Sequence, residues 1–285
     1  MSIKVNNIFY TYQKKASNAT LALNDVSLDI KDNDFVAIVG ETGSGKSTLA
    51  QMFNALLIPD QGEVINDDVI LNYKNRKNKK LRNLRRKVGL VFQFPEYQLF
   101  EETVEKDAAF GPKNFGMKQE EALKAAHEAL KQVGLDESYY ARAPFDLSGG
   151  ERRKVAIAGI LAMHPDTLIF DEPTVGFDPA SAKDLMNLIV DLHKQGKTII
   201  VITHDMNLVN AYAQKVFLLE NGKLLFEGTP AALFNYAAHY DRLDLPEVTK
   251  LAIKLKEKGV DLPIEEIRDS SDLIKYLQQW RGHHG

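Results

Sequence analysis

The chain has 285 residues, 44% of them hydrophobic, which is enough for one large core or two smaller ones. A net charge of −3 argues against nucleic-acid binding by the chain as a whole. Because the chain contains no cysteine, disulfides, thiolate chemistry and sulfur-ligated metals are excluded. This composition is consistent with a reducing compartment such as the cytoplasm. The N-terminus lacks a signal pattern, and no apolar run approaches the roughly 20 residues of a membrane-spanning helix.

A glycine-rich loop between a predicted strand and a predicted helix is the first informative stretch. Residues 35–39 form a short apolar run typical of a buried strand, and apolar residues at helical spacing follow Ser47 as far as Leu56. Between them lies a match to the P-loop pattern, whose main-chain N–H groups and helix N-terminus bind phosphate oxygens. The expected phosphate-binding residues are Gly40, Thr42, Gly43, Ser44, Gly45, Lys46, Ser47 and Thr48. Lys46 would reach the β- and γ-phosphates, and Ser47 would bind Mg²⁺. The alternative is an ordinary glycine-rich turn.

Two charged stretches follow. Residues 74–87 carry nine basic residues and no acid, which we interpret as a solvated loop and helix edge; nucleic acid or anionic lipid are the alternatives. Residues 92–103 then place Gln93 between aromatics, with Pro95 and the carboxylates Glu96, Glu101 and Glu102 after it. Pro95 and the aromatic residues Phe94, Tyr97 and Phe100 would shape a surface groove, to which Glu101, Glu102 and Glu105 would give negative charge. Such an acidic groove with aromatic walls suits a basic, partly apolar partner helix. An ordinary acidic helix start is the alternative.

A second small-residue segment, Leu147 to Glu151, precedes a predicted helix that runs through Val155, Ile157 and Leu161. We refer to it as the signature segment. Its serine hydroxyl, glycine amides and helix N-terminus predict an anion site at Ser148, Gly149 and Gly150. On its own, the segment is equally typical of a glycine helix cap.

Two further predicted strands end in polar residues. The apolar run 168–170 leads into Asp171 and Glu172, at the strand end where open α/β sheets bind ligands. Asp171 suits the Mg²⁺ shell, and Glu172 suits a base that orients or deprotonates an attacking water. Residues 197–204 form the next strand, and His204 at its end would hold the γ-phosphate and that water. The alternatives are a strand that simply ends in acids and a capping or core histidine.

Residues from about 238 onward form a small additional module. Val248, Leu251, Ala252 and Leu255 share one face of a predicted helix; Leu273, Leu277 and Trp280 share a face of another. These faces either join two subunits or pack on each other or on the rest of the chain.

In this order, the P-loop, the signature segment and the Asp-Glu strand resemble an ATP-binding cassette (ABC) ATPase over roughly residues 3 to 230. The resemblance implies that Tyr12 stacks on adenine, with Tyr10 as the nearby rival. It also implies that Gln93 senses the γ-phosphate or Mg²⁺, and that Asp178, in a "VGFD" variant of the usual segment, lies near ATP. In that family two cassettes face each other head to tail, and each covers the other's ATP with its signature segment.

The stretch 92–116 resembles more specifically the energy-coupling factor (ECF) ATPases, which drive importers of vitamins and, in one branch, of cobalt or nickel. It is most similar to the second of the two paralogous ATPases in the vitamin systems. The resemblance implies a heterodimer with the paralogous ATPase, a transmembrane coupling subunit docking near residues 93–105, and a substrate-binding membrane subunit. It places the chain at the cytoplasmic face of the cell membrane as a peripheral protein, with no role for nucleic acid.

The expected fold is therefore α/β. Residues 1–237 would form the cassette, with a P-loop core similar to RecA, an antiparallel β subdomain and a helical subdomain at about 94–161. Residues 238–285 would form a helical dimerisation module, as in the ECF ATPases. A soluble cassette acting on nucleic acid is the less favoured alternative, because the chain has neither tandem cassettes nor a coiled-coil insertion.

Overall fold

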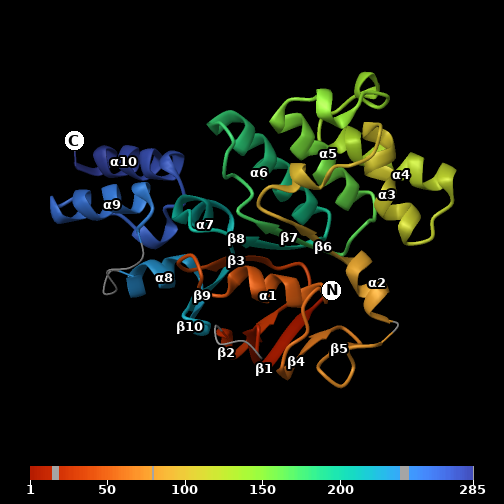
Figure 1. The fold of residues 1–285 in the computed structure, drawn as a ribbon. Helices are drawn as coiled ribbons and strands as arrows, with labels where there is room; N and C mark the ends of the chain where they lie inside the picture. Colours follow the sequence, from red (N-terminus) through yellow and green to blue (C-terminus); the bar gives the residue numbers. More distant parts are fainter. Residues whose placement is uncertain (15–18, 79, 238–243, 285) are drawn as a thin grey trace.

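A computed structural model describes residues 1–14, 19–78, 80–237 and 244–284. An antiparallel sheet forms the lower layer of the molecule in Figure 1, with the strand order β2-β1-β4-β5. Its strands are β1 (Ile3–Tyr12), β2 (Thr20–Ile30), β4 (Gln61–Asn66) and β5 (Val69–Leu71). Buried and exposed residues alternate along much of β2, as expected where one face of a sheet is covered.

The core of the molecule is a second sheet with the order β10-β9-β3-β8-β7-β6. Its strands are β3 (Phe35–Val39), β6 (Val88–Val91), β7 (Thr167–Asp171), β8 (Thr198–Ile202), β9 (Lys215–Glu220) and β10 (Lys223–Gly228). β6, β7, β8, β3 and β9 run parallel, and β10 is antiparallel to β9. All residues of β3 and β8 are buried, which explains their uninterrupted apolar sequences.

Helix α1 (Lys46–Phe53) packs in a hydrophobic cluster that also contains residues of both sheets, such as Ile8 and Ile200. The helix ends at Phe53, followed by Asn54 as its C-cap and Ala55 at φ +59°. The expectation that Leu56 belongs to the buried helical face is therefore wrong, and its side chain is exposed.

The opposite face of the core sheet is covered by a second cluster of helices. It includes α3 (Val104–Asn114), α4 (Gln119–Gln132), α5 (Gly149–Leu161) and α6 (Pro179–Lys194), and the connections contain the short 3₁₀ helices η1 (Pro95–Gln98), η2 (Glu137–Tyr139) and η3 (Pro144–Asp146). Small residues on α4, including Ala122, Ala126 and Ala129, let it approach its neighbours closely. The remaining helices of the cassette are α2 (Lys80–Lys87), α7 (Met206–Tyr212) and α8 (Pro230–Ala237).

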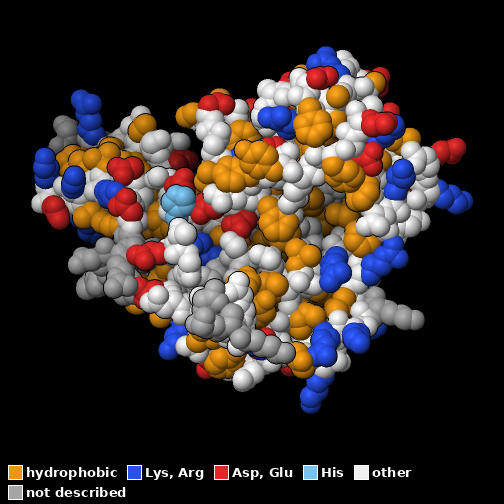
Figure 2. All heavy atoms as spheres, viewed as in Figure 1, with side chains coloured by type: hydrophobic (Ala, Val, Ile, Leu, Met, Phe, Trp, Pro, Cys, Tyr) orange, Lys and Arg blue, Asp and Glu red, His pale blue; other side chains and the backbone are white. Residues whose placement is uncertain are grey.

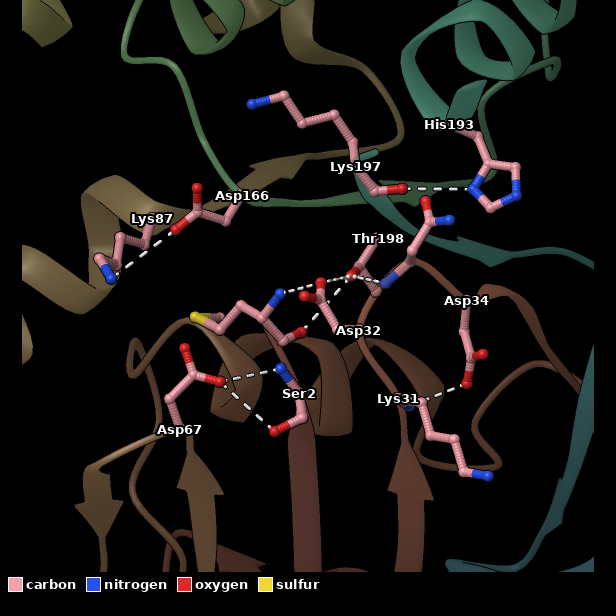
Figure 3. Close-up of polar contacts among 12 residues, drawn as sticks. Ser2, Lys31, Asp32, Asp34, Asp67, Lys87, Asp166, His193, Lys197 and Thr198 are labelled. Carbon is pink, nitrogen blue, oxygen red and sulfur yellow. Dashed lines mark hydrogen bonds and ion pairs between the residues drawn. The ribbon is translucent and has the colours of Figure 1, made fainter. Parts of the chain in front are cut away.

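Polar contacts join the two sheets at the edge where the parallel strands begin (Figure 3). Thr198 at the start of β8 accepts a hydrogen bond from the Asn33 N–H at 3.0 Å and donates to Asp32 at 3.3 Å. The N-terminal ammonium group also contacts Asp32, and Lys87 pairs with Asp166 at 3.7 Å. These contacts fix the amino edge of the sheet, so the opposite, carboxyl edge is held in a defined position.

The C-terminal part contains α9 (Glu247–Glu257), η4 (Ile264–Glu266) and α10 (Ser270–His284). Ala252 and Leu273 are buried in one cluster, with Val248, Leu255 and Leu277 packed against it, so the two predicted apolar faces pack on each other. Leu251 differs from the expectation, since it is 49% exposed.

The buried Asn210 of α7 connects this C-terminal part to the cassette. Its amide donates to the main-chain oxygens of Ile267 and Arg268 at 3.0 and 2.7 Å, and Arg268 donates back to the oxygen of Asn210 at 3.1 Å. Throughout the described ranges, we find no helix with the length and apolarity that crossing a membrane requires.

Candidate active site

Four segments named in the sequence meet at the carboxyl edge of the core sheet. The P-loop follows β3, Gln93 follows β6, Asp171 ends β7 and His204 follows β8. They line one cavity of about 460 Å³. Its lining comprises Tyr12, Thr20, Leu21, Ala22, Thr42, Gly43, Gly45, Lys46, Ser47, Thr48, Gln93, Asp171, Glu172 and His204. The sequence pattern identified eleven of these fourteen residues, and only Thr20, Leu21 and Ala22 were missed.

The P-loop wraps closely around Lys46. Its ammonium group donates to the main-chain oxygens of Gly40 and Glu41 at 2.7 and 2.8 Å, and lies 3.3 Å from the hydroxyl of Ser44. Gly40 (φ +144°) has no room for a side chain, because a Cβ there would lie 2.1 Å from the main-chain oxygen of Leu219. Gly40 and Ser44 therefore support the loop from the side away from the cavity, and Thr42, Gly43 and the residues from Gly45 to Thr48 line the cavity.

Lys46 is buried and Asp171 is half-buried, and both line the cavity. Burial lowers the pKa of Lys46, and the negative charges of Glu172 and Asp171 partly oppose this shift. Burial also raises the pKa of Asp171, against a hydrogen bond from Ser47 that lowers it. Keeping either group charged therefore costs free energy. A bound ligand with a charge of the opposite sign would offset that cost.

Glu172 is held in position by two residues beyond the end of β8. The Nδ1–H of His204 donates to its Oε1 at 2.8 Å, and the hydroxyl of the buried Thr203 lies 3.3 Å from its Oε2. Glu172 has φ +49°, an uncommon backbone conformation for a residue other than glycine. Thr203 carries no sequence signal of its own, since a threonine at a strand end is unremarkable.

The contact refines the expected role of His204. When Nδ1–H donates to Glu172, a neutral imidazole presents Nε2 only as an acceptor. A hydrogen bond from Nε2 to a phosphate oxygen therefore needs a second proton on the imidazole. A turn of the ring would instead let Nδ1–H donate to the phosphate in place of Glu172. The side chain is 71% exposed, which leaves space for that turn.

Of the two tyrosines considered for stacking on adenine, only Tyr12 lines the cavity; Tyr10 does not. Tyr12 lines the cavity at its rim, and its hydroxyl lies 3.2 Å from that of Thr48. Tyr10 packs against the core cluster and does not line the cavity; it supports Tyr12 edge to face at 4.9 Å. Leu21 on the neighbouring strand adds an apolar wall beside Tyr12.

The signature segment and Asp178 do not line this cavity. Ser148 is the N-cap of α5 and forms a capping box with Glu151, whose carboxylate accepts from the Ser148 N–H at 2.8 Å. Asp178 caps α6 by accepting from the N–H groups of Ala180 and Ser181 at 3.0 Å each. The signature segment thus lies apart from the P-loop cavity, and the anion site expected at Ser148, Gly149 and Gly150 stays a prediction.

Exposed aromatic side chains lie on the segment after Gln93. Phe94, Tyr97, Phe100 and Phe110, together with Glu101 and Glu102, make up what we call the aromatic–acidic surface. Figure 2 shows hydrophobic and acidic side chains gathered over the helical part of the molecule. Two residues expected in this groove differ, because Pro95 is buried and Glu105 contacts His127 at 2.8 Å.

The donor set fits a nucleoside triphosphate with a hard cation. Glycine main chain, a lysine and a helix N-terminus suit phosphate oxygens, and the Ser47 hydroxyl beside the Asp171 carboxylate suits Mg²⁺. Among the residues that the structure describes, no group of three or more His, Cys, Asp or Glu forms a metal site. Any cation here would therefore share its ligands with the phosphates.

A parallel sheet that gathers a P-loop, a strand-end Asp-Glu pair and a histidine at one cavity defines a nucleotide-hydrolysing cassette. Comparison with known families agrees, since the ABC transporter model matches residues 23–175. The energy-coupling factor transporter ATP-binding protein EcfA2 of Streptococcus pneumoniae is 47% identical over 277 residues, 95% of this chain and 99% of that protein. EcfA2 of Streptococcus agalactiae is 50% identical over 265 residues, 92% and 94% of the two chains.

Solved structures show the same relationship. CbiO1 from Clostridium perfringens, part of the ABC transporter complex CbiONQ, has a TM-score of 0.72 at 36% identity and covers 90% of this chain and 96% of its own. A dimeric ATP-binding cassette in a post-hydrolysis state, bound to ADP and Pi, has a TM-score of 0.71 at 34% identity, with 80% and 98% covered. The chain belongs to the ABC transporter family and, within it, to the energy-coupling factor ATP-binding proteins. It is an ATP-binding ATPase of that class.

Proposed function

We propose that this chain powers an energy-coupling factor importer of vitamins, as one of two paralogous ATPases beneath a transmembrane coupling subunit and a substrate-binding membrane subunit. The observation that carries the proposal is the combination of a hydrolytic cavity with a separate aromatic–acidic surface, joined at Gln93. The identity to the EcfA2 proteins over nearly the whole chain supports it. In this arrangement the chain works at the cytoplasmic face of the membrane as a peripheral protein.

Within the cavity, ATP binds with its base against Tyr12 and its phosphates on the P-loop from Gly40 to Thr48. Lys46 neutralises the β- and γ-phosphates, and Mg²⁺ is bound by Ser47 and Asp171 with Gln93 beside it. Glu172 accepts a proton from the attacking water or orients it, and His204 fixes the carboxylate that does so. Ser148, Gly149, Gly150 and Asp178 serve the ATP of the facing subunit, because they lie outside the cavity of their own chain.

The facing subunit is, on this proposal, the paralogous ATPase, so the pair is a heterodimer that closes head to tail on ATP. The cassette would occupy residues 1–237, and residues 238–285 would help to hold the pair together. Leu251 on α9 and Ile274 on α10 support the latter role, since both are apolar and exposed.

The coupling subunit would dock on the aromatic–acidic surface. Phe94 and Tyr97 are 43% and 82% exposed. Glu102, further along the same segment, is also exposed. Exposed aromatic rings give a partner helix apolar contact area, and the carboxylates favour a basic helix over an acidic one.

Two other functions remain as alternatives. The likeness to CbiO1 keeps open import of cobalt or nickel, the branch that the sequence resemblance also names. A role on nucleic acid has less support, because several side chains of the basic run are engaged within the chain. Lys80 pairs with Asp68 at 2.7 Å, and Arg85 donates to the main-chain oxygen of Ala55 at 2.9 Å.

Uptake measurements separate these functions. Cells depleted of the chain are supplied in parallel with labelled vitamins and with labelled cobalt and nickel. The proposal predicts that uptake of several vitamins falls together, since one motor would serve exchangeable substrate-binding subunits, and that metal uptake is unchanged. Loss of cobalt or nickel uptake alone would replace it with the metal importer, and unchanged uptake of both classes would contradict an importer role.

A further inference from the structure

The guanidinium group of Arg153 joins three segments that the sequence analysis treated separately. Arg153 lies on α5, the helix that begins with the signature segment, and is only 4% exposed. Its Nη1–H donates to the main-chain oxygen of Val175 at 2.6 Å, and its Nη2–H donates to that of Gln93. The rings of Phe177 and Phe94 lie 4.6 and 6.0 Å from its central carbon.

A buried guanidinium is costly unless charge and hydrogen bonds compensate it. Glu96 of η1 is the carboxylate that faces Arg153, but its Oε2 lies 3.8 Å from Nε, beyond hydrogen-bond distance. That oxygen is buried and has no hydrogen-bond partner among the described residues. Burial accordingly lowers the pKa of Arg153, and Glu96 only partly opposes this shift. The pair is close enough to attract and too far apart to form a hydrogen bond, so a small movement of the guanidinium toward Glu96 would complete it.

On one side, Arg153 holds the loop that follows Glu172. The Val175 N–H donates to the main-chain oxygen of Glu172 at 3.3 Å, so the carbonyl that Arg153 holds and Glu172 belong to one turn. Glu172 has the uncommon φ of +49°, which neighbouring contacts must maintain. A shift of Val175 would therefore be passed to the backbone of Glu172.

On the other side, Arg153 holds the segment that carries the aromatic–acidic surface. Gln93, whose carbonyl it binds, also lines the nucleotide cavity. The neighbouring Phe94 and Tyr97 are exposed, and their ring centroids are 6.1 Å apart. Glu96 lies between them in sequence and its side chain is still 16% exposed, so a partner that covers both rings would also reduce this remaining exposure.

We propose that Arg153 is a positioning residue that links the aromatic–acidic surface to Glu172, so that a docked partner sets the catalytic turn. A partner that covers Phe94 and Tyr97 lowers the local dielectric constant and strengthens the attraction between Glu96 and Arg153. The guanidinium then moves toward Glu96 and carries the Val175 carbonyl with it. This inference rests on the proposed docking of the coupling subunit.

The test compares ATP hydrolysis in two preparations of the tagged chain. One is the complex purified from native membranes in detergent, and the other is the free chain; kcat and KM for ATP are measured in both. Glu96→Gln keeps the size of the side chain and removes its charge. We expect an unchanged KM and free-chain kcat, but about a tenfold lower kcat in the complex, in the range typical for loss of a supporting interaction.

Arg153→Lys keeps the positive charge but lacks the planar fork that reaches two carbonyls. We expect its kcat in the complex to fall by about tenfold or more at an unchanged KM, because a displaced catalytic group costs turnover rather than binding. Arg85→Lys is the matched control, since Arg85 also donates to a main-chain carbonyl, that of Ala55, from α2. Its two kcat values should equal those of the wild type.

Thermal denaturation of each variant identifies a merely structural role. If Glu96→Gln leaves the ratio of complex to free-chain kcat unchanged, whether both values stay the same or both fall by the same factor, the inference is wrong and the docking proposal stands. If the wild-type chain is recovered without membrane subunits, the docking proposal itself is wrong, and the inference falls with it.

Discussion

At the scale of single residues, the proposed function makes Glu172 the group on which hydrolysis depends. Glu172→Gln keeps the shape of the side chain and removes the base. We expect turnover to fall by about 10²–10⁴-fold, the usual contribution of a general base, while ATP binding is retained. Phosphate release in the steady state and equilibrium binding of ATP measure the two quantities.

The matched control for that substitution is Glu63→Gln on β4, outside the cavity lining. It should hydrolyse ATP like the wild type. Hydrolysis by Glu172→Gln at the control's rate would remove Glu172 from the catalytic role, and loss of ATP binding would show that it acts in binding instead.

If Asp171 binds Mg²⁺ as proposed, its pKa should make the use of Mg²⁺ dependent on pH. Burial raises this pKa above the ordinary value of about 3.9, so a proton competes with Mg²⁺ at a higher pH than at an exposed aspartate. The Mg²⁺ concentration for half-maximal hydrolysis should therefore rise as the pH is lowered toward the raised pKa. Asp171→Asn cannot be protonated in this way, so any pH dependence that remains in this variant belongs to the nucleotide. Equal pH dependence in both proteins would contradict a metal role for Asp171.

Single residues also mark the limit of what the sequence could predict. Lys46, Asp171 and Glu172 were found because phosphate and metal chemistry demands those residue types at fixed positions. Thr203 and Arg153 were not, because only contacts with residues distant in sequence distinguish them: Thr203 contacts Glu172, and Arg153 contacts the carbonyls of Gln93 and Val175.

At the scale of elements, the P-loop depends on the close approach of β9 to the end of β3. A Cβ at Gly40 would lie 2.1 Å from the main-chain oxygen of Leu219. A Cβ at Gly43 would have no neighbouring atom within 4 Å. Gly40→Ala should therefore destabilise the chain by more than the roughly 1–3 kcal/mol of a strained backbone angle alone. Gly43→Ala, also at positive φ, should stay within that range.

Urea denaturation of the two variants tests this difference. Similar free energies of unfolding would mean that the loop can move away from β9, and that the packing of these two elements does not hold the P-loop in shape.

The elements themselves could be predicted where their pattern is complete. β3 is apolar from end to end, and its bounds agree with the expectation. α1 is shorter than expected, because apolar spacing continued to Leu56 while the left-handed conformation of Ala55 had already ended the helix. The signal in that turn was weak, since Asn54 is a residue type that can end a helix but residues 54–57 contain neither glycine nor proline.

At the scale of the whole molecule, the charge of the aromatic–acidic surface should decide assembly. Glu102 pairs with Lys106 at 2.6 Å on the exposed start of α3, and Glu101 lies beside it. Changing both glutamates to lysine should spare ATP binding, because neither lines the cavity, and weaken co-purification with the coupling subunit. Glu120→Lys with Glu121→Lys, at the start of α4, is the control with the same charge change. Equal recovery of the coupling subunit by both double variants would contradict docking at this surface.

The overall architecture followed from motif order, because the P-loop, Gln93, the Asp-Glu pair and His204 each lie at the end of a strand of one parallel sheet, and the signature segment begins a helix between two of these strands. What covers the aromatic rings of Phe94 and Tyr97 could not be predicted in the same way, since a partner leaves only exposed apolar area on a single chain. The substrate is a still more distant question, because on this proposal another polypeptide selects it.

The most direct test of the account is purification of this chain from its native membranes in detergent, with mass spectrometry of the proteins that accompany it. The account predicts a second cassette ATPase together with two polytopic membrane proteins, one of them exchangeable between preparations. A chain that is recovered as a dimer in solution, with no membrane protein, would leave the ATPase chemistry in place and contradict its role as the motor of an importer.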